Sequence, residues 1–330
     1  MVYQVAIKEV LKAYGISYVR IHDSQKGYRN EIWPVETADG RMINVTFYKR
    51  EDGIVERMRR ADTVSEYLAG CGMPTRQRID SRMLQLKSSS GITSIGVYTY
   101  LPGATIPWEA YTMTHLKLLG KTMSDMHARL DGLVIDAMPS VYDEYQMIIA
   151  RMQEYFTRPS VIGSMNLKLH VGISIDKLNE YSQLLGQLQL LPDQQVLHMD
   201  FVRGNILFKE AMSQDMAQFD GLAISGILDF EKTALGHPSM DIARTLAFLL
   251  VDCKYKPADK VQKYFLHSGY QKRGQRIDST QPDVLGALVE LFLVYDFYKF
   301  LRHNPYEFLD LNAHYTRTRD ILKRQNVIRY

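Results

Sequence analysis

Asp200 and Asn205 lie in one short run, HMDFVRGN (residues 198–205), and Asp229 follows further along the chain in the run LDFE. A positioned carboxylate can accept the proton of an attacking hydroxyl group, and an amide oxygen and a second carboxylate can hold Mg²⁺ against nucleotide phosphates. Mg²⁺ prefers oxygen ligands and needs few of them from the protein. We therefore interpret Asp200 as a general base and Asn205 and Asp229 as metal ligands of a phosphoryl-transfer site.

Two predicted strands would bring these three residues together. Residues 206–208 have the composition of a short buried strand and directly follow a tight loop that contains Gly204. Residues 224–230 predict a second strand, which would pair with the first as a hairpin. The turn of this hairpin, residues 211–221, is long and polar. The hairpin would deliver Asp229 to the loop that carries Asp200.

Three motifs in this order resemble those of the aminoglycoside phosphotransferase and choline kinase superfamily. Its members carry H-G-D-x-x-x-x-N, then I-D-[FW]-[EG], then G-x-P-x-x-D-[LI]-A, and here the motifs stand at residues 198–205, 228–231 and 236–243. Met199 replaces the usual glycine. The resemblance implies an α+β, two-lobed, protein-kinase-like fold with a small β-rich N-lobe and a larger helical C-lobe. It also implies that His198 and Asp241 are scaffold residues of the catalytic loop.

Composition excludes several other classes of protein. The 330 residues are 46% hydrophobic, which is ample for a core, and the formal net charge is only +3. No run of Lys and Arg indicates a nucleic-acid partner. Cys71 and Cys253 are the only cysteines, so neither a disulfide framework nor a structural zinc site is expected. No stretch approaches the roughly 18 apolar residues of a membrane span, and the N-terminus lacks a signal-peptide pattern, so we expect a cytoplasmic protein without membrane contact.

Hydrophobic periodicity predicts two lobes, an N-terminal nucleotide-binding lobe at residues 1–102 and a catalytic and substrate-binding lobe at residues 103–330. The elements expected in the first are a helix at 5–14, a hairpin of strands 32–35 and 42–48 around Asp39-Gly40, a helix at 54–68 and a strand at 97–101. Those expected in the second are a helix from about residue 112, a long helical insertion at 140–190 and an apolar helix at 284–301.

Two segments of the first lobe resemble the nucleotide contacts of the superfamily. The run GYRN (residues 27–30) precedes a strand, and backbone N–H groups of a glycine-containing turn can approach phosphate closely. Gly27 and Asn30 are therefore candidate phosphate contacts, while an ordinary turn would have the same composition. Residues 98–103 resemble the hinge, which would offer backbone groups of Thr99 and Leu101 to an adenine edge. A buried strand that ends at Pro102 would have the same sequence features.

The phosphate-binding lysine of the superfamily has two candidate positions here. In one register it is Lys49, next to the charged run at the strand end, and in the other the position holds Thr46. Strand alternation favours the second, because Val45 and Phe47 would share the buried face and Thr46 would point to the other side.

The glutamate that normally pairs with this lysine gives a consistent indication. Its position falls on Ala61, with Asp62 and Glu66 nearby. Bacterial homoserine kinases are similar in having a threonine in this strand and an arginine like Arg203 in the catalytic loop. Loss of the lysine would remove the need for its carboxylate partner.

Together these features predict an ATP- or GTP-dependent kinase that uses Mg²⁺ and phosphorylates a hydroxyl group of a small molecule. The acceptor could be an amino-alcohol, an amino-acid-like metabolite or an aminoglycoside-type antibiotic. Arg203 could reach the transferred phosphoryl group or an anion of the acceptor, or it could pair with a carboxylate of its own lobe. Candidate walls of the acceptor pocket lie on the later helices: Tyr264, His267, Tyr270, Tyr295, Asp296 and Tyr298.

A non-catalytic kinase-fold protein that binds a partner or a small ligand is the alternative function. The presence of Asp200, Asn205 and Asp229 argues against it, since such a protein has no physical need for all three. A protein kinase is disfavoured because no activation loop or A-P-E pattern follows Asp229, and the chain continues almost directly to the run GHP at residues 236–238.

Overall fold

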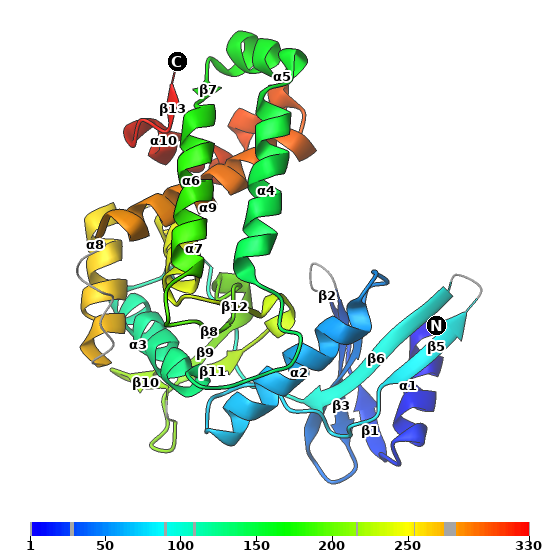
Figure 1. The fold of residues 1–330 in the computed structure, drawn as a ribbon. Coiled ribbons are helices and arrows are strands. Elements are labelled where there is room, and N and C mark those ends of the chain that lie inside the picture. The colour runs from blue at the N-terminus through cyan, green and yellow to red at the C-terminus, as the bar shows by residue number, and fades with distance from the viewer. Residues whose placement is uncertain are drawn as a thin grey trace.

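The computed structural model describes residues 2–26, 30–88, 91–107, 110–215, 217–253, 255–273 and 282–329. A curled antiparallel sheet with two helices forms the N-terminal part, and the C-terminal part is mainly helical (Figure 1). The two parts meet where α2 (Ile54–Gly70) packs against the 3₁₀ turn Phe230–Lys232. This junction is where the predicted metal ligand Asp229 lies.

The N-terminal part contains one six-stranded sheet. Its strands follow the order β1-β3-β4-β6-β5, and β2 pairs with β3 alone. Apart from α2, its elements are α1 (Val2–Ala13), β1 (Tyr18–Ile21), β2 (Gln25–Lys26), β3 (Glu31–Thr37), β4 (Met42–Phe47), β5 (Leu84–Ser88) and β6 (Gly91–Thr99).

The C-terminal part combines long helices with three small antiparallel sheets, ordered β10-β11-β9, β12-β8 and β13-β7. Its helices are α3 (Met113–Leu130), α4 (Val141–Phe156), α5 (Pro159–Ser164), α6 (Ile175–Gln189), α7 (Ser239–Asp252), α8 (Ala258–Gln262), α9 (Pro282–His303) and α10 (Ala313–Arg324). Its strands are β7 (Gly172–Ile173), β8 (Gln195–Leu197), β9 (Ile206–Glu210), β10 (Gln218–Phe219), β11 (Leu222–Ile227), β12 (Ala234–Gly236) and β13 (Ile328–Arg329).

The two faces of strand β4 serve different partners, because side chains alternate along a strand. Val45 and Phe47 join the core that the sheet forms with α1, as the alternation predicted. Tyr48, at the end of β4, instead packs with Met58 of α2 and Tyr98 of β6. The strand therefore presents one face to α1 and the other to α2 and the site.

Helix α9 is the centre of the C-terminal core. Its consecutive residues 291–294 are all fully buried, and a helix that is buried on every side lies inside the fold rather than on its surface. Helices α7 and α10 pack along it. Because α7 begins within the third sequence motif and carries its Asp241, this packing fixes the catalytic loop relative to the later helices.

The two-lobed α+β fold is confirmed, and so are the predicted helix α1, the hairpin β3–β4, helix α2 and the hairpin β9–β11. The boundary between residues 102 and 103 stays a prediction. The insertion at 140–190 is helical but also contains β7, which pairs with β13 at the end of the chain.

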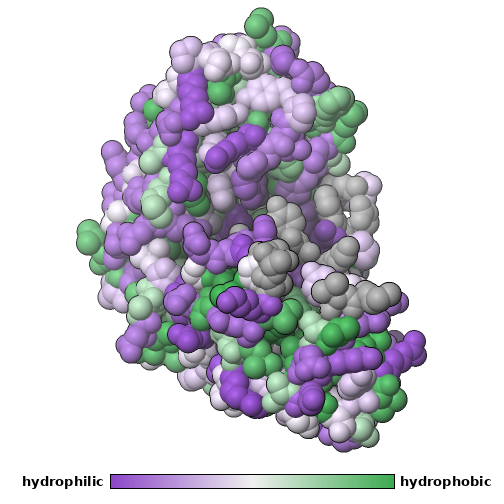
Figure 2. All heavy atoms as spheres, turned by 90° about the vertical axis from the view of Figure 1, so that its right-hand side faces the viewer, coloured by the Kyte–Doolittle hydropathy of each residue, from purple (hydrophilic) through white to green (hydrophobic). Residues whose placement is uncertain are grey.

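Within the described ranges, no helix combines the length and the apolar character needed to cross a bilayer. Mostly hydrophilic side chains border a hollow near the centre of the face shown in Figure 2.

Candidate active site

The loop that carries Asp200 is held by strands at both ends, β8 before it and β9 after it. One 3₁₀ turn, Arg203–Asn205, reverses the chain. Asn205 Nδ2 donates to the backbone oxygen of Asp200 at 2.9 Å and to its carboxylate Oδ2 at 3.1 Å. The predicted base and one predicted metal ligand are therefore in direct contact.

Asp241 anchors the start of this loop from α7. Its carboxylate accepts hydrogen bonds from the backbone N–H groups of His198 and Met199, both at 2.9 Å. His127 Nε2 lies 3.2 Å from the same carboxylate. Burial opposes ionisation of Asp241, but His127 and the backbone donors outweigh burial and keep its pKa below the usual value. A buried, ionised Asp241 thus pins the catalytic loop to α7.

His198 has the contacts of a scaffold residue. Its Nε2 is 3.1 Å from the Leu228 carbonyl oxygen, and its Nδ1 accepts from the backbone N–H of Asp200 at 3.1 Å. Burial lowers the pKa of His198 despite the nearby carboxylates of Asp241 and Asp200. The neutral ring can donate through Nε2 and accept through Nδ1, so it ties the catalytic loop to the strand that leads to Asp229.

The backbone at Met199 explains the glycine that the superfamily motif usually has there. Its φ of 58° lies in the left-handed region, which costs a residue with a side chain roughly 1–2 kcal/mol. Met199 is also buried, and burial of a methionine side chain stabilises by roughly 1.5–3 kcal/mol. The two contributions are of similar size, so methionine is tolerated at this position.

Asp229 and Asn205 are neighbours across the β9–β11 hairpin. The Leu228 N–H donates to the Asn205 carbonyl oxygen at 2.8 Å, directly beyond the pair Ile227–Ile206. Asp229 has a left-handed backbone with φ 59°, which aspartate tolerates better than most residues. The predicted hairpin therefore delivers Asp229 to the loop of the base.

The donor set of these two residues fits a magnesium ion. Asn205 uses its amide nitrogen towards Asp200, so its amide oxygen points elsewhere, and Asp229 Oδ1 accepts only a long bond of 3.4 Å from Glu231 N–H. No cluster of three or more His, Cys, Asp or Glu suited to a metal occurs in the described part of the chain. Two oxygen ligands are what Mg²⁺ needs where phosphates and water complete its shell.

Lys232 is a site residue that the sequence interpretation missed. Its Nζ lies 2.8 Å from Asp200 Oδ1, on the 3₁₀ turn that follows Asp229. Burial raises the pKa of Asp200, but Lys232 and the more distant Arg244 outweigh burial and hold it below the usual value. The sequence did contain a signal for this contact, because Lys232 follows the predicted metal ligand Asp229 by three residues. One helical turn at that spacing can direct the lysine side chain back towards Asp200.

Asn30 joins the two parts of the chain beside Asp229. Its Nδ2 donates to Glu231 Oε1 at 2.6 Å, and its Oδ1 accepts from the backbone N–H of Lys49 at 3.3 Å. Asn30 therefore lies against the segment that carries the metal ligand. Gly27, the other candidate of this run, lies outside the described residues.

The hinge candidates lie at the end of β6. The Thr99 N–H already donates to the Gln77 carbonyl oxygen at 2.9 Å, so this N–H is not available to the adenine or guanine of a nucleotide. The Leu101 backbone makes no hydrogen bond to the residues that the structure describes. Gly103, with φ 122°, approaches β9 so closely that a Cβ would lie 2.8 Å from the Phe208 carbonyl oxygen. Only glycine permits this approach, which fixes the hinge segment against β9.

The two candidate positions of the phosphate-binding lysine, Lys49 and Thr46, differ in their surroundings. Lys49 is 59% exposed and its Nζ pairs with Glu51 at 3.6 Å, so its role as a phosphate contact is not supported. Thr46 stands at the strand position, buried opposite Gly96. Ala61 is buried on α2, at the predicted place of the missing glutamate.

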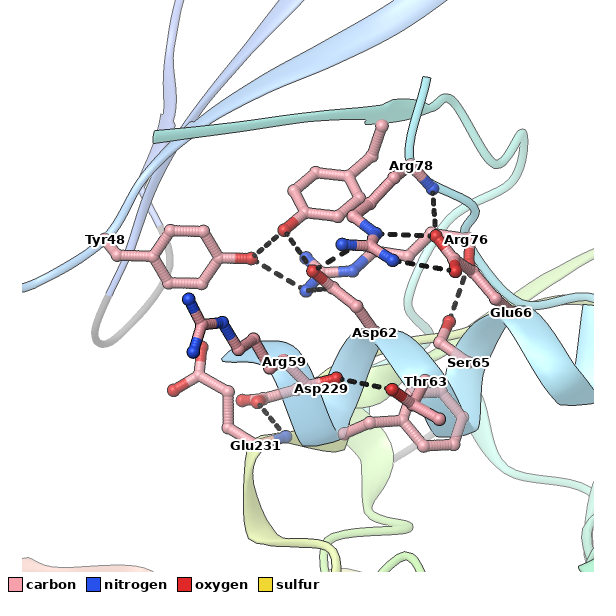
Figure 3. A network of polar contacts seen from close by, with 12 residues as sticks. Tyr48, Arg59, Asp62, Thr63, Ser65, Glu66, Arg76, Arg78, Asp229 and Glu231 are labelled. Carbon is pink, nitrogen blue, oxygen red and sulfur yellow. Dashed lines mark hydrogen bonds and ion pairs between the residues drawn. The ribbon is translucent and has the colours of Figure 1, made fainter. Parts of the chain in front are cut away.

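An arginine–aspartate pair occupies the space between α2 and the sheet. Arg76 Nη2 is 3.4 Å from Asp62 Oδ1 and donates to the Tyr48 hydroxyl at 2.8 Å. The guanidinium lies 3.9 Å over the Tyr98 ring. Figure 3 shows these side chains converging on Asp62, with Asp229 close to the same helix. Protein kinases hold a lysine–glutamate ion pair between the corresponding strand and helix, whereas here the cation comes from the segment after α2.

Arg203 pairs with its own lobe. Its Nε lies 3.9 Å from Asp252 Oδ2 at the end of α7, which is one of the arrangements left open by the sequence. Its side chain stays partly exposed, so this contact does not remove Arg203 from the surface near the catalytic loop.

Some of the predicted acceptor walls lie elsewhere. The segments of Tyr264, His267 and Tyr270 pack against α3, where the Tyr270 hydroxyl is 2.8 Å from His127 Nδ1. Tyr298 packs against Tyr155 of α4. Tyr270 and Tyr298 are buried in the core, so these two predictions were wrong, whereas Tyr264 and His267 stay predictions.

Tyr295 and Asp296 lie beside Arg244, and their role as acceptor walls stays a prediction. Arg244 of α7 has its guanidinium carbon 5.9 Å from the Tyr295 ring and its Nη1 3.9 Å from Asp296 Oδ1. Burial lowers the pKa of Arg244, but Tyr145, Asp296 and Asp200 outweigh burial and raise it. The charge of Arg244 therefore interacts both with Asp296 of α9 and with the predicted base Asp200.

A curled antiparallel sheet joined to a helical lobe, with the sequence motifs at the junction, is the architecture of protein-kinase-like phosphotransferases. A family model described as Phosphotransferase enzyme family matches residues 23–255. The chain belongs to this family. The match confirms the superfamily predicted from the motifs, and with it the prediction of a small-molecule kinase.

Several solved structures are similar to the whole chain. Amicoumacin kinase hAmiN in complex with AMP-PNP, Ca²⁺ and Ami is 14% identical, with a TM-score of 0.69 over 99% of this chain and 97% of that one. The GDP complex of wild-type aminoglycoside 2'-phosphotransferase-IIIa is 13% identical, with a TM-score of 0.60 over 96% and 99%. Macrolide 2'-phosphotransferase MphH from Brachybacterium faecium is 15% identical, with a TM-score of 0.55 over 95% and 97%. At these identities the likeness shows the fold alone. No curated protein matched the sequence.

Proposed function

We propose that this chain transfers the terminal phosphoryl group of ATP or GTP to a hydroxyl group of a small polar molecule. The observation that carries the proposal is the position of Asp200. Its two carboxylate oxygens contact Asn205 and Lys232, and the hairpin brings Asp229 alongside. Solved structures of similar fold include kinases of antibiotics, which supports a small hydroxyl-bearing acceptor.

Asp200 orients the acceptor hydroxyl and takes up its proton. A base must be ionised to do this, and the depressed pKa of Asp200 keeps it ionised at neutral pH. Lys232 shares one carboxylate oxygen with the incoming hydroxyl, so it positions the carboxylate as well as holding its charge. In the reaction the acceptor oxygen forms a bond to the terminal phosphorus, the bond from that phosphorus to the bridging oxygen breaks, and the nucleoside diphosphate leaves.

Asn205 and Asp229 are the residues that would hold Mg²⁺. The ion would bridge the phosphate oxygens and neutralise the charge that develops on them. The backbone of Leu101, together with the carbonyl group rather than the N–H of Thr99, is proposed to meet the base of the nucleotide, and Asn30 and Gly27 are proposed to contact its phosphates. Residues 1–102 would form the nucleotide-binding lobe and residues 103–330 the catalytic lobe.

Nucleotide-dependent thermal stabilisation tests the proposal directly. We expect ATP or AMP-PNP to raise the unfolding temperature of the wild-type protein more with Mg²⁺ than without it. Asp229→Ala should remove the Mg²⁺-dependent part more completely than Asn205→Ala, because a carboxylate brings net charge to the metal and an amide does not. Lys177→Met on the exposed surface of α6 serves as the control.

Turnover decides between an enzyme and a binding protein. Coupled detection of ADP over a panel of hydroxyl metabolites and antibiotics should give an acceptor-dependent rate. Stabilisation by nucleotide without any turnover would favour the non-catalytic binding protein, and equal Mg²⁺ responses in Asp229→Ala and the wild type would contradict the metal site.

A further inference from the structure

Three ion pairs of the C-terminal part share one arrangement of exposure. They are Lys232 with Asp200 at 2.8 Å, Lys299 with Asp296 at 2.5 Å, and Arg203 with Asp252 at 3.9 Å. In each pair the cation is the exposed partner, with 34–39% of its side chain accessible, whereas the carboxylates are only 5–11% accessible. A molecule that approaches these three ion pairs from the solvent therefore meets the cations before the carboxylates.

Contacts and electrostatics place these pairs in one region. His314 of α10 lies 3.7 Å from Asp252 and feels the charges of Asp296, Lys299 and Arg203. Burial lowers the pKa of Lys299, Asp296 raises it, and Arg244 and Lys232 lower it further. Burial likewise lowers the pKa of His314, which keeps the ring neutral. The region thus combines several cations whose fields overlap, beside the base.

Buried Arg244 adds a further positive charge next to the Lys299–Asp296 pair. Its Nε and Nη1 atoms make no hydrogen bond to the described residues, and its guanidinium lies 4.7 Å from the Phe248 ring and 5.4 Å from the Phe292 ring. A buried charge with few hydrogen bonds is weakly screened, so its field extends to the neighbouring groups. Asp296 is already shared between Arg244 and Lys299. An ammonium group of a ligand that approached Asp296 would therefore lie next to the positive charges of Arg244 and Lys299.

We propose that the acceptor carries a carboxylate, which Lys299 and Arg203 bind while its hydroxyl group lies at Asp200. This inference rests on the proposed phosphotransferase function and selects among its acceptors. A polycationic antibiotic would have to place ammonium groups against Lys232, Lys299 and Arg203, because the carboxylates that could receive them lie beneath these cations. A small hydroxy acid or hydroxylated amino acid matches both the exposed cations and the adjacent base.

Acceptor pairs that differ by one carboxylate test the proposal. The pairs are glycerate and glycerol, L-serine and ethanolamine, L-homoserine and 3-aminopropanol, and glucuronate and glucose, with kanamycin as the polycation. ADP release is measured at saturating Mg·ATP over the rate without acceptor. We expect at least one carboxylate to be turned over with a kcat/KM roughly tenfold or more above that of its partner, the ratio that one charge-assisted hydrogen bond supplies.

Lys299→Met supplies the second arm. It should raise the KM of that carboxylate by roughly ten- to a hundredfold, the range expected for a lost hydrogen bond to a charged group, and leave the KM of ATP unchanged. Lys177→Met should change neither constant. A change in kcat alone would indicate a structural role for Lys299 and overturn the proposal.

The outcomes separate the two proposals. Turnover of kanamycin or of a partner that lacks a carboxylate with a kcat/KM equal to or above that of every carboxylate, or no turnover of any carboxylate, overturns the anionic acceptor. Mg²⁺-dependent nucleotide binding, measured in the same preparations by thermal shift, reports on the phosphotransferase proposal independently. Loss of that binding signal in the wild type would count against the proposed function itself.

Discussion

Replacing Arg76 with methionine should destabilise the N-terminal lobe by about 3 kcal/mol. Breaking a buried ion pair by removing one partner typically costs about 3–5 kcal/mol, because the other charge stays buried and uncompensated. Asp62 is almost completely buried, and Arg76 is its partner at 3.4 Å. Arg78 remains 3.8 Å away from Asp62, so the lower end of this range applies. The variant also removes the donor to the Tyr48 hydroxyl, whose pKa burial raises to about 12.

Thermal unfolding at neutral pH measures this loss. The entropy of unfolding is about 2.1 cal/mol/K per residue, or about 0.7 kcal/mol/K for 330 residues, so a loss of about 3 kcal/mol should lower the unfolding temperature by about 4 °C. Arg82→Met is the matched control, because Arg82 forms an exposed pair with Asp80 and surface changes usually stay within about 0.5 kcal/mol.

The stability loss of Arg76→Met should depend on pH, because Asp62 is ionisable. Burial raises the pKa of Asp62, and Arg76 and Arg78 lower it, with the net shift upward. An acid with a raised pKa in the folded state favours folding when it is protonated, and this contribution is lost as the pH rises through the folded pKa. Without Arg76 the pKa of Asp62 rises further, so the deficit of Arg76→Met should shrink as the pH falls. A variant as stable as Arg82→Met at neutral pH would refute the assigned ion pair.

Two further predictions concern Lys232 and the cysteines. Lys232→Met removes the cation that lowers the pKa of Asp200, so the acidic limb of the pH profile of kcat/KM should move to higher pH. Lys232→Arg should keep this limb near the wild-type position. An unmoved profile in Lys232→Met would contradict the contact between Lys232 and Asp200. Burial raises the pKa of Cys253 to about 11, so a thiol reagent at pH 8 should label only the half-buried Cys71 in the native protein, and rapid labelling of two thiols would be inconsistent with the packing of α7.

Local patterns predicted much of the fold and part of the candidate site. The alternation in residues 43–47 predicted that Val45 and Phe47 face the core, and the structure shows this. The motif spacing placed Asp200 and Asn205 on one loop, where they are in contact. Such inferences succeed because a strand or a short loop fixes side-chain directions over a few residues.

Interactions between distant segments could not be predicted in this way. Arg76 lies beyond the end of α2, and nothing in its local pattern indicated that it would pair with Asp62. The pairing of β7 with β13 joins two-residue strands from distant segments of the chain, too short to define a register. Tyr270 was predicted as an acceptor wall because it lies on the later helices, but in the structure it is buried and its hydroxyl group lies 2.8 Å from His127 Nδ1.

Asp200→Asn tests the central claim most directly. The amide has nearly the same shape as the carboxylate but cannot take up a proton from the acceptor hydroxyl. We predict that kcat, measured with an acceptor identified in the charge-matched panel, falls by at least ~10²-fold, the loss typical of removing a general base, while AMP-PNP still binds in the presence of Mg²⁺. Turnover close to that of the wild type in Asp200→Asn would contradict the assignment of Asp200 as the base and the mechanism built on it.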